Sequence, residues 1–451
     1  MKTRIVEFSD VISTMRFDGS YHNAEVNVYD KVISSHSDHQ LSYYCSEIFT
    51  SGRNKRMYTT EEFGVPFLSN SDVSAANPLM ACKYSSKKYG YDEKAVLKTG
   101  MILTGRVGAI GQTAFVPAYL EKEKAMGSDN IIRICVKPEF KNGFIYAYLA
   151  SKIGNLSFWK HATGGVQPFI TDSMVGELPI PNFSDAFQQE VDDLIQESAR
   201  LREEAADCLS QAHKLIEHNF STSVFKKNEV ISIKDIIDDN MKRFDASYHI
   251  SESVTYENEI KRGKYSFLKD LCEDISGGGR GKRYYTDNKI KGVPFFSNSD
   301  LGKANPLRSC KYSLISKTFD ESSLLKEGMI VTGRVGAIGQ TQYIGSSYEK
   351  LKVMGSDNVI KIVPSKNNGF IYSYLSSKIG NSMFWKYSTG GVQPFISSKM
   401  VGQILVPIFD RIIIEQCNKL IELYSEKKEK SNILENKAID IVEEEIEKWN
   451  N

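Results

Sequence analysis

The residues best suited to binding a charged ligand lie in the segment TGRVGAIGQT, which begins at Thr104 and recurs unchanged from Thr332. A phosphate-binding P-loop needs a lysine after its second glycine, and Gln112 stands there instead. The dinucleotide-binding glycine spacing is also absent. We therefore predict a β-hairpin whose glycines adopt positive φ. Arg106 and Arg334 at this turn could reach a phosphate or a guanine edge, so DNA contact and a structural role both remain open.

A cluster of basic residues precedes this hairpin in two places. GRNKRMY begins at Gly52 and GRGKRYY at Gly279. A charge cluster is usually a solvated surface, but these two occupy corresponding positions on glycine-containing loops. A loop that contacts the DNA backbone is therefore the competing interpretation.

Two further repeated motifs carry amide side chains. SNSD, at Ser69 and Ser297, could read base edges or form a turn. In FWKHATGGVQPFI we expect Trp159 in the core, whereas a glutamine beside the Gly-Gly turn could pair with an adenine. The candidate DNA-contacting residues on all these motifs are Arg53, Lys55, Arg56, Asn70, Arg106, Lys160, Gln167, Arg280, Lys282, Arg283, Asn298, Arg334, Lys386 and Gln393.

Groups that could perform catalysis or bind a metal are not arranged for it. The seven histidines form no pair at ligand spacing in both copies, and the seven cysteines form no CxxC pair. NPL at Asn77 and Asn305 is not the NPPY-type motif of an adenine methylase, and no nuclease-like carboxylate cluster recurs. We therefore predict a non-enzymatic chain with no catalytic residue, no metal site and no cofactor of its own.

The motifs recur because the chain contains a tandem duplication. RFDGSYH from Arg16 returns as RFDASYH from Arg243, and further shared motifs follow at an offset of 226 to 228 residues. This period is too long for a solenoid, so each copy is a domain. Short apolar stretches separated by Gly, Pro and Asn indicate strands, and NGFIYAYLASKIGN from Asn142 indicates one helix that ends before Gly154.

A long amphipathic helix is predicted after each copy. Apolar residues keep a three-four spacing from Asp185 to about Asn219, and again from Ile413 to Trp449. We expect the two helices to pack on each other. The predicted fold is α+β, with a first domain at 1–182, a helix at 183–222, a second domain at 223–409 and a helix at 410–451.

The charge of the chain is distributed unevenly along it. The 451 residues carry 57 Lys plus Arg and 56 Asp plus Glu, a formal charge of +1. The two domains carry +2 and +9, whereas the helices carry −6 and −4. Such a distribution is expected if the domains contact phosphates and the helices face a protein, and it predicts stronger DNA binding by the second domain. No signal peptide or apolar run long enough to span a membrane is present, which indicates a cytoplasmic protein.

The order of parts and the motifs resemble the specificity subunit of type I restriction-modification systems over essentially the whole chain. The closest motif likeness is in TGGVQPFITDSMVGELPIP from Thr163 and TGGVQPFISSKMVGQILVP from Thr389. Met101 and Met329 depart from the aspartate that this family often has in its hairpin. The resemblance implies two target recognition domains on double-stranded DNA, one for each half of a bipartite target.

The same resemblance implies an antiparallel coiled coil of the two helices with pseudo-twofold symmetry. It also implies docking of two methyltransferase subunits and, through them, of restriction or translocase subunits. S-adenosylmethionine, ATP and Mg would be bound by those partners. Two alternatives are a stand-alone tandem-domain DNA-binding protein and, against the missing motifs, a fused methylase or nuclease.

Overall fold

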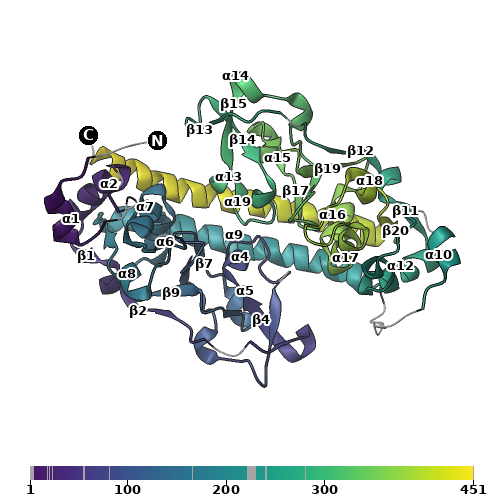
Figure 1. The fold of residues 1–451 in the computed structure, drawn as a ribbon, viewed down its shortest axis with the longest axis horizontal. Coiled ribbons are helices and arrows are strands. Elements are labelled where there is room, and N and C mark those ends of the chain that lie inside the picture. Colours follow the sequence, from purple (N-terminus) through teal and green to yellow (C-terminus); the bar gives the residue numbers. More distant parts are fainter. Residues whose placement is uncertain are drawn as a thin grey trace. The chain divides into compact units, whose positions relative to one another are not determined.

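The computed structural model describes residues 5–449 except positions 18, 20, 23, 54, 55, 81, 165, 221–229, 239, 240 and 280. The chain divides into two compact units. Unit 1 contains residues 1–203 and 430–451, and unit 2 contains residues 204–429. Each unit therefore combines one globular lobe with parts of two long helices, α9 (Asp185–Glu217) and α19 (Arg411–Lys448), which are uninterrupted ribbons in Figure 1.

The lobe of unit 1 is built on two four-stranded sheets. One sheet is antiparallel, in the order β2 (Cys45–Thr50), β9 (Ile131–Val136), β6 (Ile102–Gly105) and β7 (Thr113–Phe115). The other has the order β3 (Tyr58–Thr59), β5 (Lys83–Ser86), β4 (Gly64–Leu68) and β8 (Met126–Gly127), and its last pair is parallel. A short pair completes the strands, β1 (His39–Gln40) with β10 (Pro179–Ile180). The helices of this lobe are α1 (Phe8–Thr14), α2 (Ala24–Ser35), α3 (Leu41–Tyr44), α4 (Asn70–Val73), α5 (Ala118–Lys122), α6 (Asn142–Ala150), α7 (Lys152–His161) and α8 (Asp172–Gly176).

The lobe of unit 2 repeats this plan. Its four-stranded sheets have the orders β12-β19-β16-β17 and β13-β15-β14-β18, and β11 pairs with β20. These strands are β11 (Tyr265–Phe267), β12 (Cys272–Gly277), β13 (Tyr285–Thr286), β14 (Gly292–Phe296), β15 (Lys311–Leu314), β16 (Ile330–Gly333), β17 (Thr341–Tyr343), β18 (Met354–Gly355), β19 (Val359–Pro364) and β20 (Leu405–Pro407). The helices are α10 (Ile233–Asp238), α11 (Ala246–His249), α12 (Glu252–Arg262), α13 (Pro306–Ser309), α14 (Ile315–Thr318), α15 (Ser346–Lys350), α16 (Asn368–Ser376), α17 (Lys378–Tyr387) and α18 (Ser398–Val401). The mixed α and β content predicted from the sequence is confirmed.

The single helix predicted from Asn142 is two helices. Ser151 separates α6 from α7, and its side chain accepts a hydrogen bond from the Gly154 amide at 2.9 Å. Gly154 thus lies in the first turn of α7 instead of ending a helix. A Cβ there would lie 2.2 Å from the Tyr148 carbonyl oxygen, so only glycine permits this close turn. Gly380 has the same role in unit 2.

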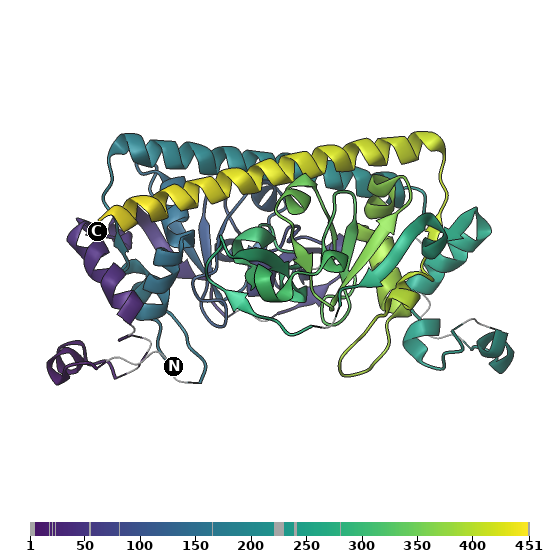
Figure 2. The same ribbon diagram turned by 90° about the horizontal axis from the view of Figure 1, so that it is seen from above.

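The long helices that the sequence predicted are present as α9 and α19, and they contact each other inside each unit. In unit 1 the Ser198 hydroxyl donates to the Ser431 carbonyl at 2.9 Å, while the Phe183 ring, just before α9, stacks on Trp449 at 4.6 Å. In unit 2 Lys427 pairs with Glu204 at 2.6 Å. In each unit, therefore, the two helical segments run antiparallel. Figure 2 shows α19 (yellow) as one continuous helix.

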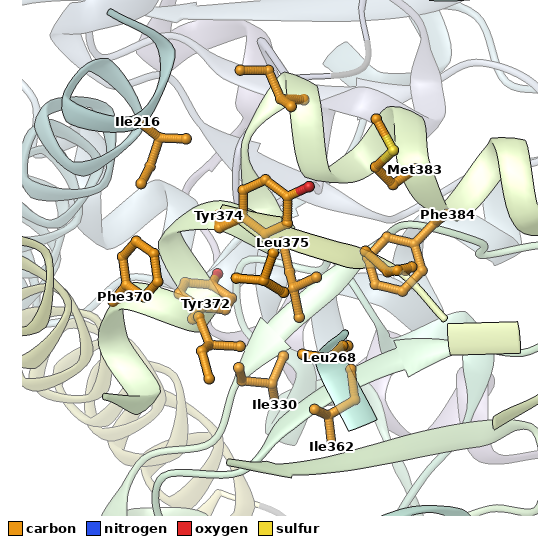
Figure 3. Packing of buried hydrophobic residues seen from close by; sticks show 14 of the residues in the cluster. Ile216, Leu268, Ile330, Ile362, Phe370, Tyr372, Tyr374, Leu375, Met383 and Phe384 are labelled. Carbon is orange, nitrogen blue, oxygen red and sulfur yellow. The ribbon is translucent and has the colours of Figure 1, made fainter. Parts of the chain in front are cut away.

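Each lobe packs its core against both helical segments of its unit. In unit 2, Tyr372, Tyr374 and Leu375 of α16 belong to one buried cluster with Ile330 and Ile362 of the sheet, part of which Figure 3 shows. Ile216 of α9 and Cys417 of α19 belong to the same cluster. Burying an aliphatic or aromatic side chain of this size contributes about 1.5 to 3 kcal/mol, so the helix segments are part of the core.

Candidate nucleic-acid interface

The repeated arginine lies at a rigid turn in each lobe. Strands β6 and β7 form the predicted hairpin, and Gly108 and Gly111 adopt φ of 75° and 72°. The Arg106 amide donates to the Asn130 carbonyl at 2.8 Å, and the Arg106 carbonyl accepts from Ile170 at 3.0 Å. The prediction of a hairpin with positive-φ glycines is confirmed. The side chain of Arg106 is half-buried at this fixed backbone position.

The SNSD motif holds this arginine turn in place. Ser69 and Asp72 form a capping box at the start of α4, and the Asn70 amide donates to the Val107 carbonyl at 3.0 Å. Asn298 makes the same bond to Val335 in unit 2. The turn interpretation of this motif is therefore confirmed, and the base contact predicted for the asparagines stays a prediction. Asn70 Oδ1 is buried and forms no hydrogen bond within the described part of the chain.

The basic loop is anchored to an aspartate from the MGSDN motif. Arg56 Nη2 lies 2.8 Å from Asp129 Oδ1, and Arg53 Nε lies 3.6 Å from Asp129 Oδ2. The hydrogen bond that Arg56 donates to the Asp129 carboxylate raises the pKa of Arg56 above its ordinary value. In unit 2 Arg283 pairs with Asp357. Lys282 is exposed, whereas the predicted Lys55 and Arg280 lie outside the described residues.

Each lobe has a projecting loop that carries one candidate glutamine. The loop lies between α7 and α8 in unit 1 and between α17 and α18 in unit 2. Figure 2 shows the loop of unit 2 in yellow-green, reaching away from the rest of its lobe. Phe169 closes its base by bridging to Thr163 and to Val107. Gln167 and Gln393 are exposed at the tips, beside Val166 and Val392, which are fully accessible. The arginine turn and this loop are therefore neighbours in unit 1.

The two predicted lysines lie in the interior instead. Lys160 pairs with Asp30, and Lys386 lies 2.7 Å from Glu257 with its side chain 4% exposed. Both ammonium groups also lie over tyrosine rings. Because each charge is already compensated inside its lobe, this arrangement does not favour the DNA contact predicted for Lys160 and Lys386.

The expectation that Trp159 is a core residue was wrong. Trp159 is 36% exposed, and its counterpart Trp385 is 48% exposed. The preceding Phe158 and Phe384 fill the core of each lobe. A helix presents consecutive residues on different faces, which explains why the tryptophan next to a buried phenylalanine points outward.

The described residues show no arrangement for metal binding or thiol chemistry. They contain no group of three His, Cys, Asp or Glu side chains that could hold a metal ion. Burial raises the pKa of the Cys45, Cys272 and Cys310 thiols to about 12, so these cysteines stay protonated and unreactive. Among the helices described, none is long and apolar enough to cross a membrane.

Asp129 and Asp357 were not among the residues predicted for the site. The sequence did contain a signal, because MGSDN recurs unchanged at Met126 and Met354. The motif contains no basic side chain, and the contact of its aspartate with Arg56 spans 73 residues. The Ser51 hydroxyl donates to the Gly127 carbonyl at 3.4 Å, and β4 pairs in parallel with β8, so contacts between distant residues bring the two segments together.

No family model matches this chain, and no curated protein matches its sequence. Among solved structures the chain is similar to the type I restriction-modification S subunit from M. genitalium, at 13% identity and a TM-score of 0.34, over 91% of this chain and 94% of that one. It is also similar to the HsdS subunit from Thermoanaerobacter tengcongensis, at 14% identity and a TM-score of 0.28, over 89% and 95% of the two chains. These scores do not assign a function, which has to come from the residues of the chain itself.

Proposed function

We propose that this chain is the specificity subunit of a type I restriction-modification system, a non-catalytic reader of double-stranded DNA. Each lobe would recognise one half of a bipartite target. The observation that carries the proposal is the duplicated arrangement of Arg56, Asn70, Arg106 and Gln167 in one lobe and their counterparts in the other. Arginine and glutamine are the side chains that pair best with guanine and adenine edges.

The long helices support the second half of the proposal, which concerns protein partners. Their sequences carry net charges of −6 and −4, so they are poor surfaces for DNA. Within each unit both helix segments already pack against the lobe, and their outward faces remain for other chains. We propose that they form an antiparallel coiled coil with pseudo-twofold symmetry, which separates the half-sites and docks two methyltransferase subunits in the cytoplasm.

The chemistry would belong to those partners. Restriction or translocase subunits would join through the methyltransferases, which would bind S-adenosylmethionine, and ATP and Mg would also be bound outside this chain. The absence of a catalytic constellation in the sequence motifs supports this division of labour. The chain itself would supply position and sequence choice only.

Sequencing methylated adenines in the host, with and without the gene for this chain, tests the proposal. The expected result is one bipartite motif whose methylation disappears with the gene. Purification of the tagged chain from the same host should recover methyltransferase subunits. A solitary chain, together with an unchanged methylation pattern, would refute the proposal and favour a stand-alone DNA-binding protein.

A further inference from the structure

We infer that Asp129 and Asp357 are specificity-determining residues, because they orient Arg56 and Arg283 to read a guanine edge in place of holding a phosphate. This inference rests on the proposed function and goes further, since it names a base and the residues that select it. It concerns a single arrangement that occurs once in each lobe.

The geometry of the ion pair is the first support. The side chain of Asp129 is 13% exposed and that of Arg56 is 49% exposed, so the carboxylate lies beneath the guanidinium. The corresponding values for Asp357 and Arg283 are 12% and 39%. A surface ion pair between two mobile side chains would expose both partners. Here only the arginine faces solvent.

Each arginine also lies over an aromatic ring. Arg56 Cζ lies 6.0 Å from the centroid of Phe67, and Arg283 Cζ lies 5.5 Å from that of Phe295. An arginine held by a carboxylate and a ring loses less side-chain entropy when it binds a ligand, because its planar guanidinium is already oriented. Two independent contacts therefore restrict the same side chain in each lobe.

The loop that carries the aspartate is itself held rigid. Strand β8 pairs with β4 through Phe67 and Met126, and the Ser128 amide donates to the Leu68 carbonyl at 2.9 Å. Below the loop, the fully buried Arg133 donates to the carbonyls of Ile131 at 2.9 Å and Ala95 at 3.1 Å. In unit 2 Lys361 occupies the position of Arg133 and donates to the Ser322 carbonyl.

The chemistry of this arrangement favours a base over a phosphate. A guanidinium has five N–H donors, and the bond from Arg56 to Asp129 comes from Nη2 alone. Two of the remaining donors can match the two acceptors of guanine, O6 and N7, in the major groove. A phosphate on the same arginine would bring a full negative charge near the Asp129 carboxylate, which Arg53 at 3.6 Å offsets in part, whereas the guanine edge carries no net charge.

Substitution of Asp129 by asparagine in the full chain distinguishes these roles. DNA duplexes carrying the target found by methylome sequencing, and copies with each base pair changed in turn, supply the probe. For D129N we expect roughly 10- to 100-fold less discrimination at one G·C pair of one half-site, the range given by a bidentate arginine–guanine pair. Binding to unrelated DNA should be equal or slightly stronger, because one negative charge has been removed. D357N should act in the same way on the other half-site only.

Two matched variants separate this effect from charge and from misfolding. Glu139 is an exposed acid of the same lobe, so E139Q removes the same charge and should leave base discrimination unchanged. R56K keeps the positive charge but lacks the planar, bidentate guanidinium. It should therefore show the same loss of base discrimination at the same base pair as D129N. An equal gain of affinity for all sequences in D129N would identify Arg56 as a phosphate contact and overturn the inference. If the unmodified chain shows no sequence preference, the proposed function fails instead.

Discussion

Tyr146 donates its hydroxyl to Glu435 at 2.6 Å, although 289 residues separate the two. Both side chains are buried, and Glu435 also pairs with Arg202 at 3.1 Å. This cluster joins a helix of the first lobe to both long helices within unit 1. The corresponding tyrosine of unit 2, Tyr372, faces Tyr424, whose hydroxyl lies 3.5 Å away. Unit 1 therefore has a charged cluster at the position where unit 2 has a pair of tyrosines.

Removal of Glu435 should destabilise unit 1 strongly. Burial lowers the pKa of Arg202, but Glu435 together with the nearby Tyr146 and Tyr119 raises that pKa above its ordinary value. In Glu435→Ala the Arg202 guanidinium stays in the same surroundings but loses its carboxylate partner. This loss lowers the free energy of unfolding by about 3 kcal/mol. Urea unfolding of the full chain measures the change. Glu444→Ala, on an exposed face of the same helix, is the control, and an equal effect of both substitutions would contradict the prediction.

The stability of unit 2 should fall as the pH drops from about 6.5 to about 4. His213 is half-buried and shares a hydrogen bond of 2.8 Å with the Ser376 hydroxyl, and desolvation lowers its pKa to about 4. The unfolded chain, with an ordinary histidine pKa near 6.5, binds the proton more readily over this range, so protonation favours unfolding. The loss should reach about 3 kcal/mol at pH 4. In His213→Gln this part of the pH dependence should disappear, and an unchanged profile would show that His213 does not cause it.

Arg106→Ala should weaken DNA binding and flatten its salt dependence. Loss of one phosphate contact lowers the slope of log K against log salt by about 0.9. Arg334→Ala is the matched variant in the second lobe, where the guanidinium also lies 4.9 Å from the Phe395 ring. Filter binding at several salt concentrations gives the slope. Unchanged affinity and slope would leave Arg106 with a structural role only.

Gln167→Ala and Gln393→Ala should each relax recognition at one position of one half-site. Both glutamines lie exposed at the tips of the projecting loops, where an amide can pair with adenine N6 and N7. We expect about 1 to 3 kcal/mol less discrimination at that adenine. Binding to base-substituted duplexes measures this loss. A uniform decrease over all duplexes would point to a backbone contact.

The two half-sites should share several bases in inverted orientation. The hairpin, SNSD and TGGVQPFI motifs recur almost unchanged, and dimeric readers with twofold symmetry bind inverted half-sites. Differences between the half-sites should follow the segments that diverge most, 23–48 against 250–275 and 114–124 against 342–352. Methylome sequencing reads both half-sites directly, and two unrelated half-sites would show the prediction to be wrong.

Features with a local cause could be predicted from the sequence. The glycine spacing in TGRVGAIGQT specified a hairpin, because glycine adopts without strain the positive φ found at Gly108 and Gly111. The heptad-like spacing of apolar residues after Asp185 specified α9, because the period of that spacing matches the helical period. Both signals lie within a few residues of the structure that they predict.

Features that depend on distant partners could not be predicted. Lys160 was expected to contact DNA because it lies near the Gly-Gly turn of FWKHATGGVQPFI, but its partner Asp30 lies 130 residues away. Asp129 was overlooked for the same reason, since its role depends on Arg56. The break at Ser151 was missed because the apolar pattern continues through it, and only the short contact at Gly154 shows the turn.

The composition of the two units sets an order for their synthesis. Unit 2 is one continuous stretch, 204–429, whereas unit 1 needs residues 430–451 to complete its core. Ala438, Val442 and Ile446 leave the ribosome more than two hundred residues after the lobe that they cover. The first lobe to be translated is therefore the last to be finished, and until then its apolar surface is exposed to proteases and chaperones.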